Sequence, residues 1–326
     1  MSIKLIALDM DGTLLNRQKL VSEENASAIK RAMDKGIYVT IATGRMPASA
    51  VYFAKQLNMN CPVISCNGGV VKDLNTGKSI YEAHFPKDTI TKLISICYQK
   101  NWYIRWYIGD TIYIRYVDMD MFLAYKTTKG LNIVEVGDEF EKYTENVTQL
   151  VVCDLNGNIQ KIQDELSNIF KDKIGLQQNT EYTMDITLPN INKAVGLSKL
   201  AQYLQIDKSE IMACGDGDND LAMIEYAGLG VAMGNGEDEL KDQATHVTDT
   251  NNQNGIAKAL SHYGLIHFET ENSFTSDDDN FNKVKDFHHL MDGSTTDMPR
   301  VYGIKEASHR SDFKLEEIVE FLYASS

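Results

Sequence analysis

Short apolar runs alternate with amphipathic segments near both ends of the chain. Residues 3–9, 37–43 and 62–66 are rich in Ile, Val and Leu and predict strands. Between them, the apolar spacing predicts a helix over residues 22–36, with Ser22 as its N-cap, and another over about 47–57. Strands that alternate with helices in this way are typical of a parallel sheet covered by helices on both faces.

The same alternation resumes after about residue 190. We therefore assign residues 1–82 and 190–266 to one α/β core. The elements expected in its second part are a helix at 193–204, a strand at 210–214, a helix at 220–226, a strand at 229–233 and a helix at about 254–263.

The middle of the chain has a different pattern, which we interpret as a domain inserted at residues 83–189. Residues 102–108 and 111–117 flank the turn-forming pair Gly109-Asp110 and predict a β-hairpin. The order of elements favours an antiparallel α+β arrangement. The other elements expected here are helices at about 87–100 and 158–170 and strands at 149–153 and 183–187.

From residue 267 onward the chain becomes polar, acidic and aperiodic, as in a linker. Helical spacing returns at about 280–291 and again at 314–322. Residues 267–326 are therefore expected to form an acidic linker and a partial helical tail.

Composition narrows the classes of function. Of 326 residues, 43% are hydrophobic and 24% are charged, as in ordinary soluble globular proteins. The formal net charge of -14 argues against a nucleic-acid partner, which would need a basic surface. The chain begins without a signal-peptide pattern, and no apolar run approaches membrane-spanning length, so no membrane partner is expected. Five cysteines without a Cys-x-x-Cys pair indicate reduced thiols and a cytoplasmic location.

The first strand stops abruptly at two aspartates, Asp9 and Asp11, which one residue separates. Gly12 then permits a sharp turn. Two carboxylates at the end of a buried strand repel each other and resist desolvation, so this arrangement favours a bound cation. An acidic turn after an edge strand is the alternative interpretation of this segment.

Three later positions carry related chemistry. Thr43 follows the second strand and offers a hydroxyl, although Thr43-Gly44-Arg45 fits a simple turn equally well. Lys193 stands at a helix N-terminus, where a cation opposes the helix dipole unless an anion lies nearby. By itself it also fits a solvated surface lysine. The strand at 210–214 runs into an acidic, glycine-rich loop that contains Asp216, Asn219 and Asp220.

The segments around Asp9, Thr43 and Asp216 each follow an apolar strand directly, and ligands of such folds bind at the carboxyl ends of the strands. We therefore expect these side chains, with Lys193, to converge on one crevice. Carboxylate oxygens without imidazole or thiolate favour Mg²⁺. A hydroxyl, a lysine and a helix N-terminus beside that ion predict a phosphoryl-binding site.

In their order and spacing these motifs resemble those of the haloacid dehalogenase (HAD) superfamily. They are Asp9-x-Asp11-Gly12-Thr13, Thr43, Lys193 and Gly215-Asp216-x-x-Asn219-Asp220. Flanking residues, including Asn67-Gly68-Gly69 and Val231-Ala232-Met233-Gly234-Asn235, resemble the Cof-type branch. Gly69 stands where that branch usually has alanine. The resemblance covers about residues 3–264. It implies a Rossmann-like parallel sheet core with an inserted α+β cap domain that reads the leaving group.

The resemblance also implies a mechanism and the roles of the residues. The protein would be a Mg²⁺-dependent phosphatase that hydrolyses a small phosphorylated metabolite through an aspartyl-phosphate on Asp9. Asp11 would act as general acid and then as general base. The implied phosphate-binding residues are Thr43, Gly44, Lys193 and Asn219, the implied metal ligands are Asp9, Asp216 and the backbone carbonyl of Asp11, and the implied supporting residues are Asp220, Arg45 and Asn67.

Two further groups of residues have weaker signals. Arg45, Asn67 and Asn235 are expected to face the crevice, but each also fits a cap or a turn. On the predicted hairpin, alternating polar side chains form a face that fits either substrate contact or an exposed or dimeric surface. They are Tyr103, Arg105, Tyr107, Tyr113 and Arg115.

The tail has its own resemblance. Glu316-Glu317-Ile318-Val319-Glu320 places Glu316 and Glu320 on one helix face, and it resembles the opening of a MazG-like nucleotide pyrophosphohydrolase. The second half of that family's metal motif is absent before Ser326, so the tail fits a truncated fusion or an ordinary acidic helix.

Two alternative functions stay open for the whole chain. One is a phosphotransferase or mutase with the same intermediate, and the other is a regulatory or binding protein that acts through its tail.

Overall fold

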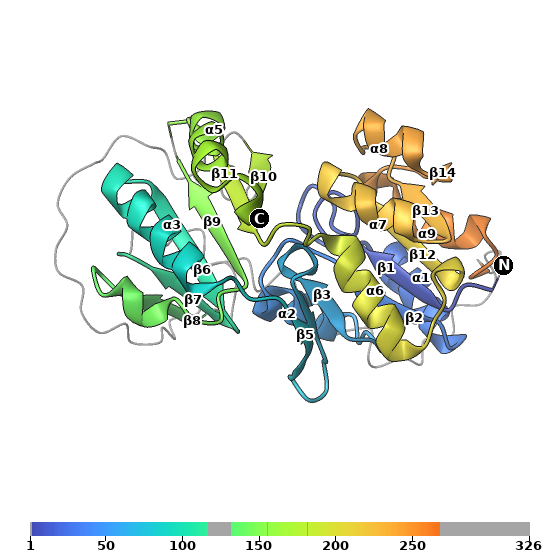
Figure 1. Ribbon diagram of the computed structural model, residues 1–326. Coiled ribbons are helices and arrows are strands. Elements are labelled where there is room, and N and C mark those ends of the chain that lie inside the picture. Colours follow the sequence, from blue (N-terminus) through green and yellow to red (C-terminus); the bar gives the residue numbers. More distant parts are fainter. Residues whose placement is uncertain (1, 117–131, 155, 181, 268–326) are drawn as a thin grey trace, which may run out of the picture. The chain divides into compact units, whose positions relative to one another are not determined.

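The protein is described by a computed structural model over residues 2–116, 132–154, 156–180 and 182–267 (Figure 1). The predicted tail elements lie outside these residues. Among the described helices, none is long and apolar enough to cross a membrane.

The first sheet has five strands in the order β14-β13-β12-β1-β2, and every pairing in it is parallel. Its strands are β1 (Leu5–Leu8), β2 (Tyr38–Ile41), β12 (Ile211–Gly215), β13 (Leu229–Ala232) and β14 (His246–Val247).

Helices cover both faces of this sheet, which confirms the predicted parallel α/β core. Because successive strand residues point to opposite faces, Ile6 and Leu8 pack on one side of β1, while Leu5 and Ala7 pack on the other. The first side is covered by α1 (Glu23–Asp34), α2 (Pro47–Gln56) and α9 (Gly255–His262). The second side is covered by α6 (Lys193–Leu204), α7 (Leu221–Tyr226) and α8 (Asp238–Gln243).

Side-chain caps fix where two of these helices begin. Ser22 Oγ accepts a hydrogen bond of 3.2 Å from the backbone N–H of Asn25, as predicted for the start of α1. Asn192 Oδ1 accepts one of 3.1 Å from the backbone N–H of Val195. The second cap matters most, because it places Lys193 at the first position of α6.

The expectation that residues 62–66 continue the parallel sheet was right only in part. A separate antiparallel sheet is formed by β3 (Val63–Ser65), β4 (Val70–Lys72) and β5 (Ser79–Glu82). Cys66, Asn67 and Gly68 all have positive φ angles, so the chain reverses directly after β3 and returns beside it. A single parallel bridge, Ala42 to Ile64, connects this hairpin to the residue after β2.

The insertion contains a six-stranded sheet in the order β10-β11-β9-β6-β7-β8. The predicted hairpin is present, with Gly109 at a φ of 57° in its turn. The strands β8, which is short, and β10, which is mostly polar, were not predicted. All six strands lie within residues 83–189. The strands are β6 (Tyr103–Ile108), β7 (Thr111–Ile114), β8 (Asn132–Glu135), β9 (Gln149–Cys153), β10 (Gly175–Thr180) and β11 (Thr183–Thr187).

The two faces of this six-stranded sheet differ in their partners. Ile104 and Trp106 lie on the face that packs under α3 (Lys87–Lys100) and α5 (Ile159–Phe170). Tyr107 lies on the opposite face, is 5% exposed, and packs with residues of the core such as Met46 and Cys66.

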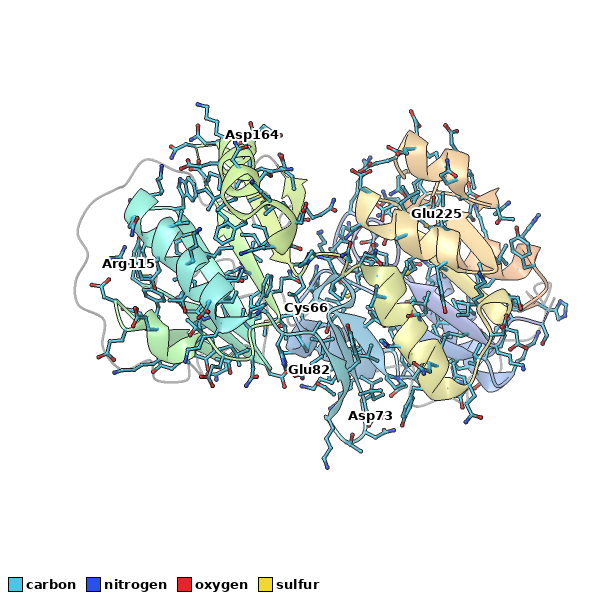
Figure 2. The ribbon with its side chains drawn as sticks, viewed as in Figure 1. Cys66, Asp73, Glu82, Arg115, Asp164 and Glu225 are labelled. Atoms are coloured by element: carbon cyan, nitrogen blue, oxygen red, sulfur yellow. The ribbon has the colours of Figure 1, made fainter. Side chains whose placement is uncertain are left out.

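The grouping of five polar hairpin side chains on one face was therefore wrong in part. Tyr113 stacks on Trp106, which lies on the helix-covered face. Arg115 belongs to the same face, because its guanidinium lies 4.3 Å from the ring centre of Tyr98 in α3 (Figure 2). Tyr107 is also too buried to belong to an exposed surface. All five cysteines are unpaired and buried, as expected for reduced thiols.

The packing of α6 against the core predicts that Gly196→Ala is destabilising. A Cβ at Gly196 would lie 2.5 Å from Ile64 Cγ2 and 2.8 Å from Gly68 Cα. We expect the free energy of unfolding to fall by about 1–3 kcal/mol, as is usual for overpacking. Urea unfolding measures it, with the exposed Gln202→Ala on the same helix as the control. Equal stability of the two variants would contradict this packing.

Candidate active site

Three functional side chains follow three adjacent parallel strands. Asp9 follows β1, Thr43 comes two residues after β2, and Asp216 follows β12, and β1 lies between the other two strands. Parallel strands bring their carboxyl ends to one edge of the sheet. The convergence predicted from sequence therefore has its physical basis in the strand order.

Lys193 connects this edge to α6. Its ammonium donates hydrogen bonds of 2.6 Å to Asp9 Oδ1 and of 2.6 Å to Asp220 Oδ1. The lysine side chain is fully buried, so it is not the solvated surface lysine of the alternative interpretation. The two carboxylates outweigh the cost of burial and raise the pKa of Lys193, so the ammonium stays charged.

Asp220 also organises the loop after β12. Its Oδ2 accepts the backbone N–H groups of Asp216 at 2.9 Å and Gly217 at 3.1 Å. Asp216 Oδ1 in turn accepts a hydrogen bond of 2.6 Å from the Thr13 hydroxyl. The acidic loop is therefore held by backbone donors and by a hydroxyl, and one oxygen of Asp216 is oriented by the turn after β1.

Gly12 provides the space that Asp216 occupies. Its φ is +82°, and a Cβ built on it would lie 2.0 Å from Asp216 Oδ2. Both the backbone conformation and the close approach therefore require glycine. Asn235 fixes the same turn, since its Nδ2 donates to the Gly12 carbonyl at 2.8 Å and its Oδ1 accepts from the Asn251 N–H at 2.8 Å.

Asp11 has different partners from Asp9. Arg45 binds its carboxylate through two nitrogens, Nε and Nη2, each at 2.8 Å, and Lys19 Nζ donates at 2.8 Å. Burial raises the pKa of Asp11, but Arg45 and Lys19 outweigh burial and hold the pKa below its ordinary value. The structure thus contains Asp11 as an ionised carboxylate.

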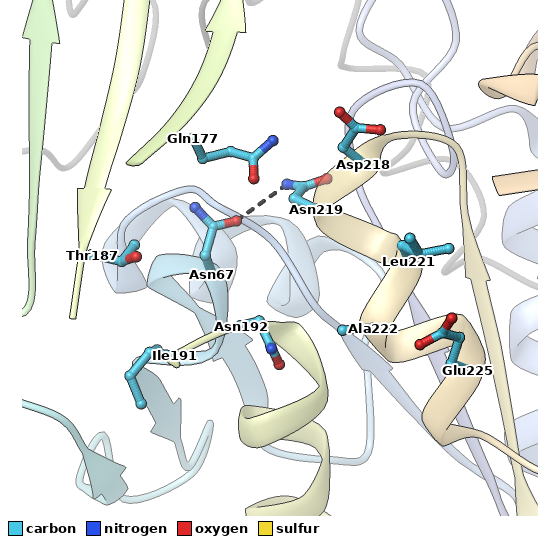
Figure 3. Close-up of a pocket in the computed structure, with 10 residues that line it drawn as sticks. All are labelled: Asn67, Gln177, Thr187, Ile191, Asn192, Asp218, Asn219, Leu221, Ala222 and Glu225. Carbon is cyan, nitrogen blue, oxygen red and sulfur yellow. Dashed lines mark hydrogen bonds between the residues drawn. The ribbon is translucent and has the colours of Figure 1, made fainter. Parts of the chain in front are cut away.

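The loop after β2 meets the reversal after β3. The Thr43 hydroxyl accepts the N–H of Arg45 at 3.2 Å, and a Cβ on Gly44 would lie 3.0 Å from Asn67 Oδ1. Asn67 Oδ1 accepts a hydrogen bond of 3.1 Å from Asn219 Nδ2. The hydrogen bond between Asn67 and Asn219 therefore joins the reversal after β3 to the loop after β12 (Figure 3).

Asn67 also contacts the insertion, through a residue that sequence reasoning missed. Its Nδ2 donates a hydrogen bond of 2.8 Å to Asp185 Oδ2 in β11. Burial raises the pKa of Asp185 to about 6, although the charge of Arg105 and hydrogen bonds from Asn179 and Asn67 oppose the rise. The available signal was the polar residue at every second position of β11, which marks one sheet face.

Carboxylate oxygens near Lys193 form a group that fits a divalent cation. One oxygen each of Asp9, Asp216 and Asp220 lies within 4.8 Å of the other two. Burial, followed by the charge of Asp220, raises the pKa of Asp216 to about 6, and the same two causes raise the pKa of Asp9 well above 3.8. Carboxylates that crowd each other in this way gain stability from a cation, and hard oxygen donors suit Mg²⁺.

Comparisons with known proteins agree with this geometry. The model of the family described as "haloacid dehalogenase-like hydrolase" matches residues 6–260. The 5-amino-6-(5-phospho-D-ribitylamino)uracil phosphatase YitU of Bacillus subtilis is 35% identical over 79% of this chain and 97% of its own. The same organism's YcsE, of the same name, is 33% identical over 81% and 96%. A haloacid dehalogenase-like hydrolase from Bacteroides thetaiotaomicron superposes with a TM-score of 0.74 at 30% identity, over 80% of this chain and all of that one.

The chain belongs to the haloacid dehalogenase-like hydrolases. Within them it is a phosphatase of the Cof type, a phosphoric monoester hydrolase, as the sequence predicted. A second family model, described as phosphoribosyl-ATP pyrophosphohydrolase, matches residues 284–326. This match agrees with the predicted resemblance of the tail to a nucleotide pyrophosphohydrolase. That segment lies outside the described residues.

Gly12→Ala tests the contact between the first turn and Asp216. The added methyl group would displace the Asp216 carboxylate, and a displacement of about 1 Å at a reacting centre costs on the order of 100-fold in rate. We expect phosphate release from an aryl phosphate to fall by about that factor, as measured by kcat/KM.

Gly77→Ala is the matched control. Gly77 also has a positive φ, of +67°, but a Cβ there has no neighbour within 4 Å. Both variants strain the backbone, whereas only Gly12→Ala reaches Asp216. Equal loss of activity in the two would show that strain alone, without displacement of Asp216, is responsible.

Asp185→Asn tests the buried carboxyl of the insertion. A folded-state pKa of about 6, above the ordinary 3.8, means that the folded protein binds this proton more tightly than the unfolded chain. Its contribution to stability is therefore complete below about pH 4 and is lost as pH rises to about 6. The total loss is up to about 3 kcal/mol. Asparagine does not ionise. In urea unfolding, the free energy of unfolding of the variant should therefore increase relative to that of the parent as pH rises through this range. Parallel pH profiles would contradict the burial of this charge.

Proposed function

We propose that the protein is a Mg²⁺-dependent phosphatase that hydrolyses a small phosphomonoester through an aspartyl-phosphate on Asp9. The observation that supports it most strongly is the pairing of Asp9 with the buried ammonium of Lys193 at 2.6 Å. A carboxylate that an ammonium orients at the carboxyl end of a strand has the properties of a nucleophile, and covalent catalysis divides a difficult hydrolysis into two steps.

The surrounding residues take complementary roles in this proposal. Lys193 stabilises charge on the transferring phosphoryl group, and Thr43, Gly44 and Asn219 line the same edge. Such catalysis consists mainly of positioning and of charge stabilisation by groups that are already in place. Asp220 keeps Lys193 oriented, since its Oδ1 lies 2.6 Å from Nζ.

Asp11 is suited first to the base role. Its ion pairs with Arg45 and Lys19 keep it ionised, and an ionised carboxylate accepts a proton from attacking water. To donate a proton to the leaving oxygen, it must first lose part of this pairing. We infer that substrate binding draws Arg45 away from Asp11 and toward the phosphate.

Mg²⁺ would be held by Asp9, Asp216 and the backbone carbonyl of Asp11. When bound, it supplies positive charge that neutralises the phosphate and offsets the repulsion between the crowded carboxylates. Asp220 is less suited as a direct ligand, because both of its oxygens already accept hydrogen bonds, one from Lys193 and the other from two backbone N–H groups.

The substrate that we propose to test first is 5-amino-6-(5-phospho-D-ribitylamino)uracil, the compound named for YitU and YcsE. Both relatives align with this chain over nearly their whole length. Sugar phosphates, nucleotides and other cofactor phosphates complete the panel.

The mechanism is tested with Asp9→Asn and with metal removal. We expect the substitution to lower phosphate release from an aryl phosphate by at least about 1,000-fold, because it removes the nucleophile. Chelation of divalent cations should abolish release in the parent protein, and added Mg²⁺ should restore it. Mass spectrometry of acid-quenched enzyme should find one phosphoryl group on the peptide that contains Asp9.

The exposed Asp242→Asn on α8 is the control for a lost carboxylate, and it should retain activity. Full activity of Asp9→Asn would refute the mechanism. Transfer to an added sugar in excess of transfer to water would instead identify a phosphotransferase.

A further inference from the structure

A pocket of about 280 Å³ lies beside the proposed phosphoryl site (Figure 3). Asn67 and Asn219 are part of its wall, and their mutual hydrogen bond marks the boundary with the strand ends. The proposed nucleophile Asp9 and Lys193 are not among the lining residues. The pocket is therefore placed to receive the part of a substrate that follows the phosphate. The lining residues are Asn67, Gln177, Thr187, Ile191, Asn192, Asp218, Asn219, Leu221, Ala222 and Glu225.

The register of the insertion's sheet explains the wall that faces Asn67. Gln177 pairs directly with Asp185 across β10 and β11, and Thr187 follows Asp185 by two residues, so all three share one sheet face. Asp185 is already bound by Asn67 at 2.8 Å and lies close to the charge of Arg105. The polar groups that this wall leaves for a ligand are therefore the neutral amide of Gln177 and the hydroxyl of Thr187.

The charges of the pocket have one sign. Asp218 and Glu225 are exposed carboxylates on its α7 side, and none of the ten lining residues is a lysine or an arginine. Lys193, which follows the lining residue Asn192, is held by Asp9 and Asp220 instead. An anionic group would meet two carboxylates here without a compensating cation, which is unfavourable.

We propose that this pocket binds the leaving group and selects an uncharged, hydroxyl- or amino-bearing organic group over an anionic one. This inference rests on the proposed phosphatase function and adds the substrate class. Gln177 and Thr187 supply hydrogen bonds to such a group, and Ile191 and Leu221 supply apolar contact. Glu225 and Asp218 exclude a second phosphate or a carboxylate.

The test compares two six-carbon substrates, sorbitol 6-phosphate and 6-phosphogluconate, which differ only in an alcohol or a carboxylate at the end away from the phosphate. We expect kcat/KM of the parent protein to favour sorbitol 6-phosphate by about tenfold or more, from like-charge repulsion. Glu225→Lys should shrink this preference by about the same factor, because it replaces repulsion by attraction. Thr187→Val should lower kcat/KM several-fold more for sorbitol 6-phosphate than for an aryl phosphate, because an aryl group has no hydroxyl for Thr187 to bind.

Glu24→Lys is the matched control, since it makes the same change of charge at an exposed position of α1, on the opposite side of the core sheet. The proposal is overturned if the parent shows no preference between the two substrates, or if Glu225→Lys and Glu24→Lys shift it equally.

Failure of the pocket and failure of the phosphatase mechanism are distinguishable. Hydrolysis of an aryl phosphate that depends on Asp9, without discrimination between the two sugar phosphates, would leave the function standing and refute the pocket. If nothing is hydrolysed, calorimetric titration of the same two phosphates into the parent and Glu225→Lys proteins measures the preference directly. Equal binding of both would also refute it.

Discussion

A fully buried ammonium held between two carboxylates is the interaction on which the rest of this structure depends. Lys193 Nζ lies 2.6 Å from Asp9 and 2.6 Å from Asp220, and none of the lysine side chain is exposed. Removing the cation would leave both carboxylates buried without a partner, which typically costs about 3–5 kcal/mol. Asp9 directly follows β1, Asp220 closes the loop after β12 and Lys193 begins α6. This single contact therefore joins segments from both parts of the core sequence.

The same principle separates the two aspartates that follow β1. Asp9 is paired with Lys193, whereas Asp11 is paired with Arg45 and Lys19, so each carboxylate has its own cations. The repulsion that the sequence suggests is therefore distributed between different partners. In a chain of net charge -14, these three cations gather at one edge of the sheet, where an anionic phosphate would need them.

The insertion is connected to this centre by hydrogen bonds as well as by an apolar cluster that includes Met46, Cys66 and Tyr107. One face of its sheet is closed by helices, and the other buries polar side chains, including Asp185 and Gln149, at 5% and 1% exposure. Gln149 Nε2 donates to the Gly44 carbonyl at 3.1 Å, and Asp185 accepts from Asn67. Asn67 makes this contact from a left-handed backbone conformation with a φ of 49°. The polar part of this face, around Asp185, suits the recognition of polar groups.

Local pattern determined most of the elements, and the bounds of α3, α6, β9 and β11 agree with the sequence prediction to the residue. The sequence also placed Asp9, Thr43 and Asp216 together, because parallel strands present their carboxyl ends at one edge whatever lies between them. It missed the short strands β4, β5, β8 and β14 and the polar strand β10, whose pairing depends on neighbours more than on their own residues. Only the tertiary structure decided which cation meets which carboxylate and brought Asp185 to Asn67. These choices depend on distances between side chains far apart in the sequence, and no local pattern records such distances.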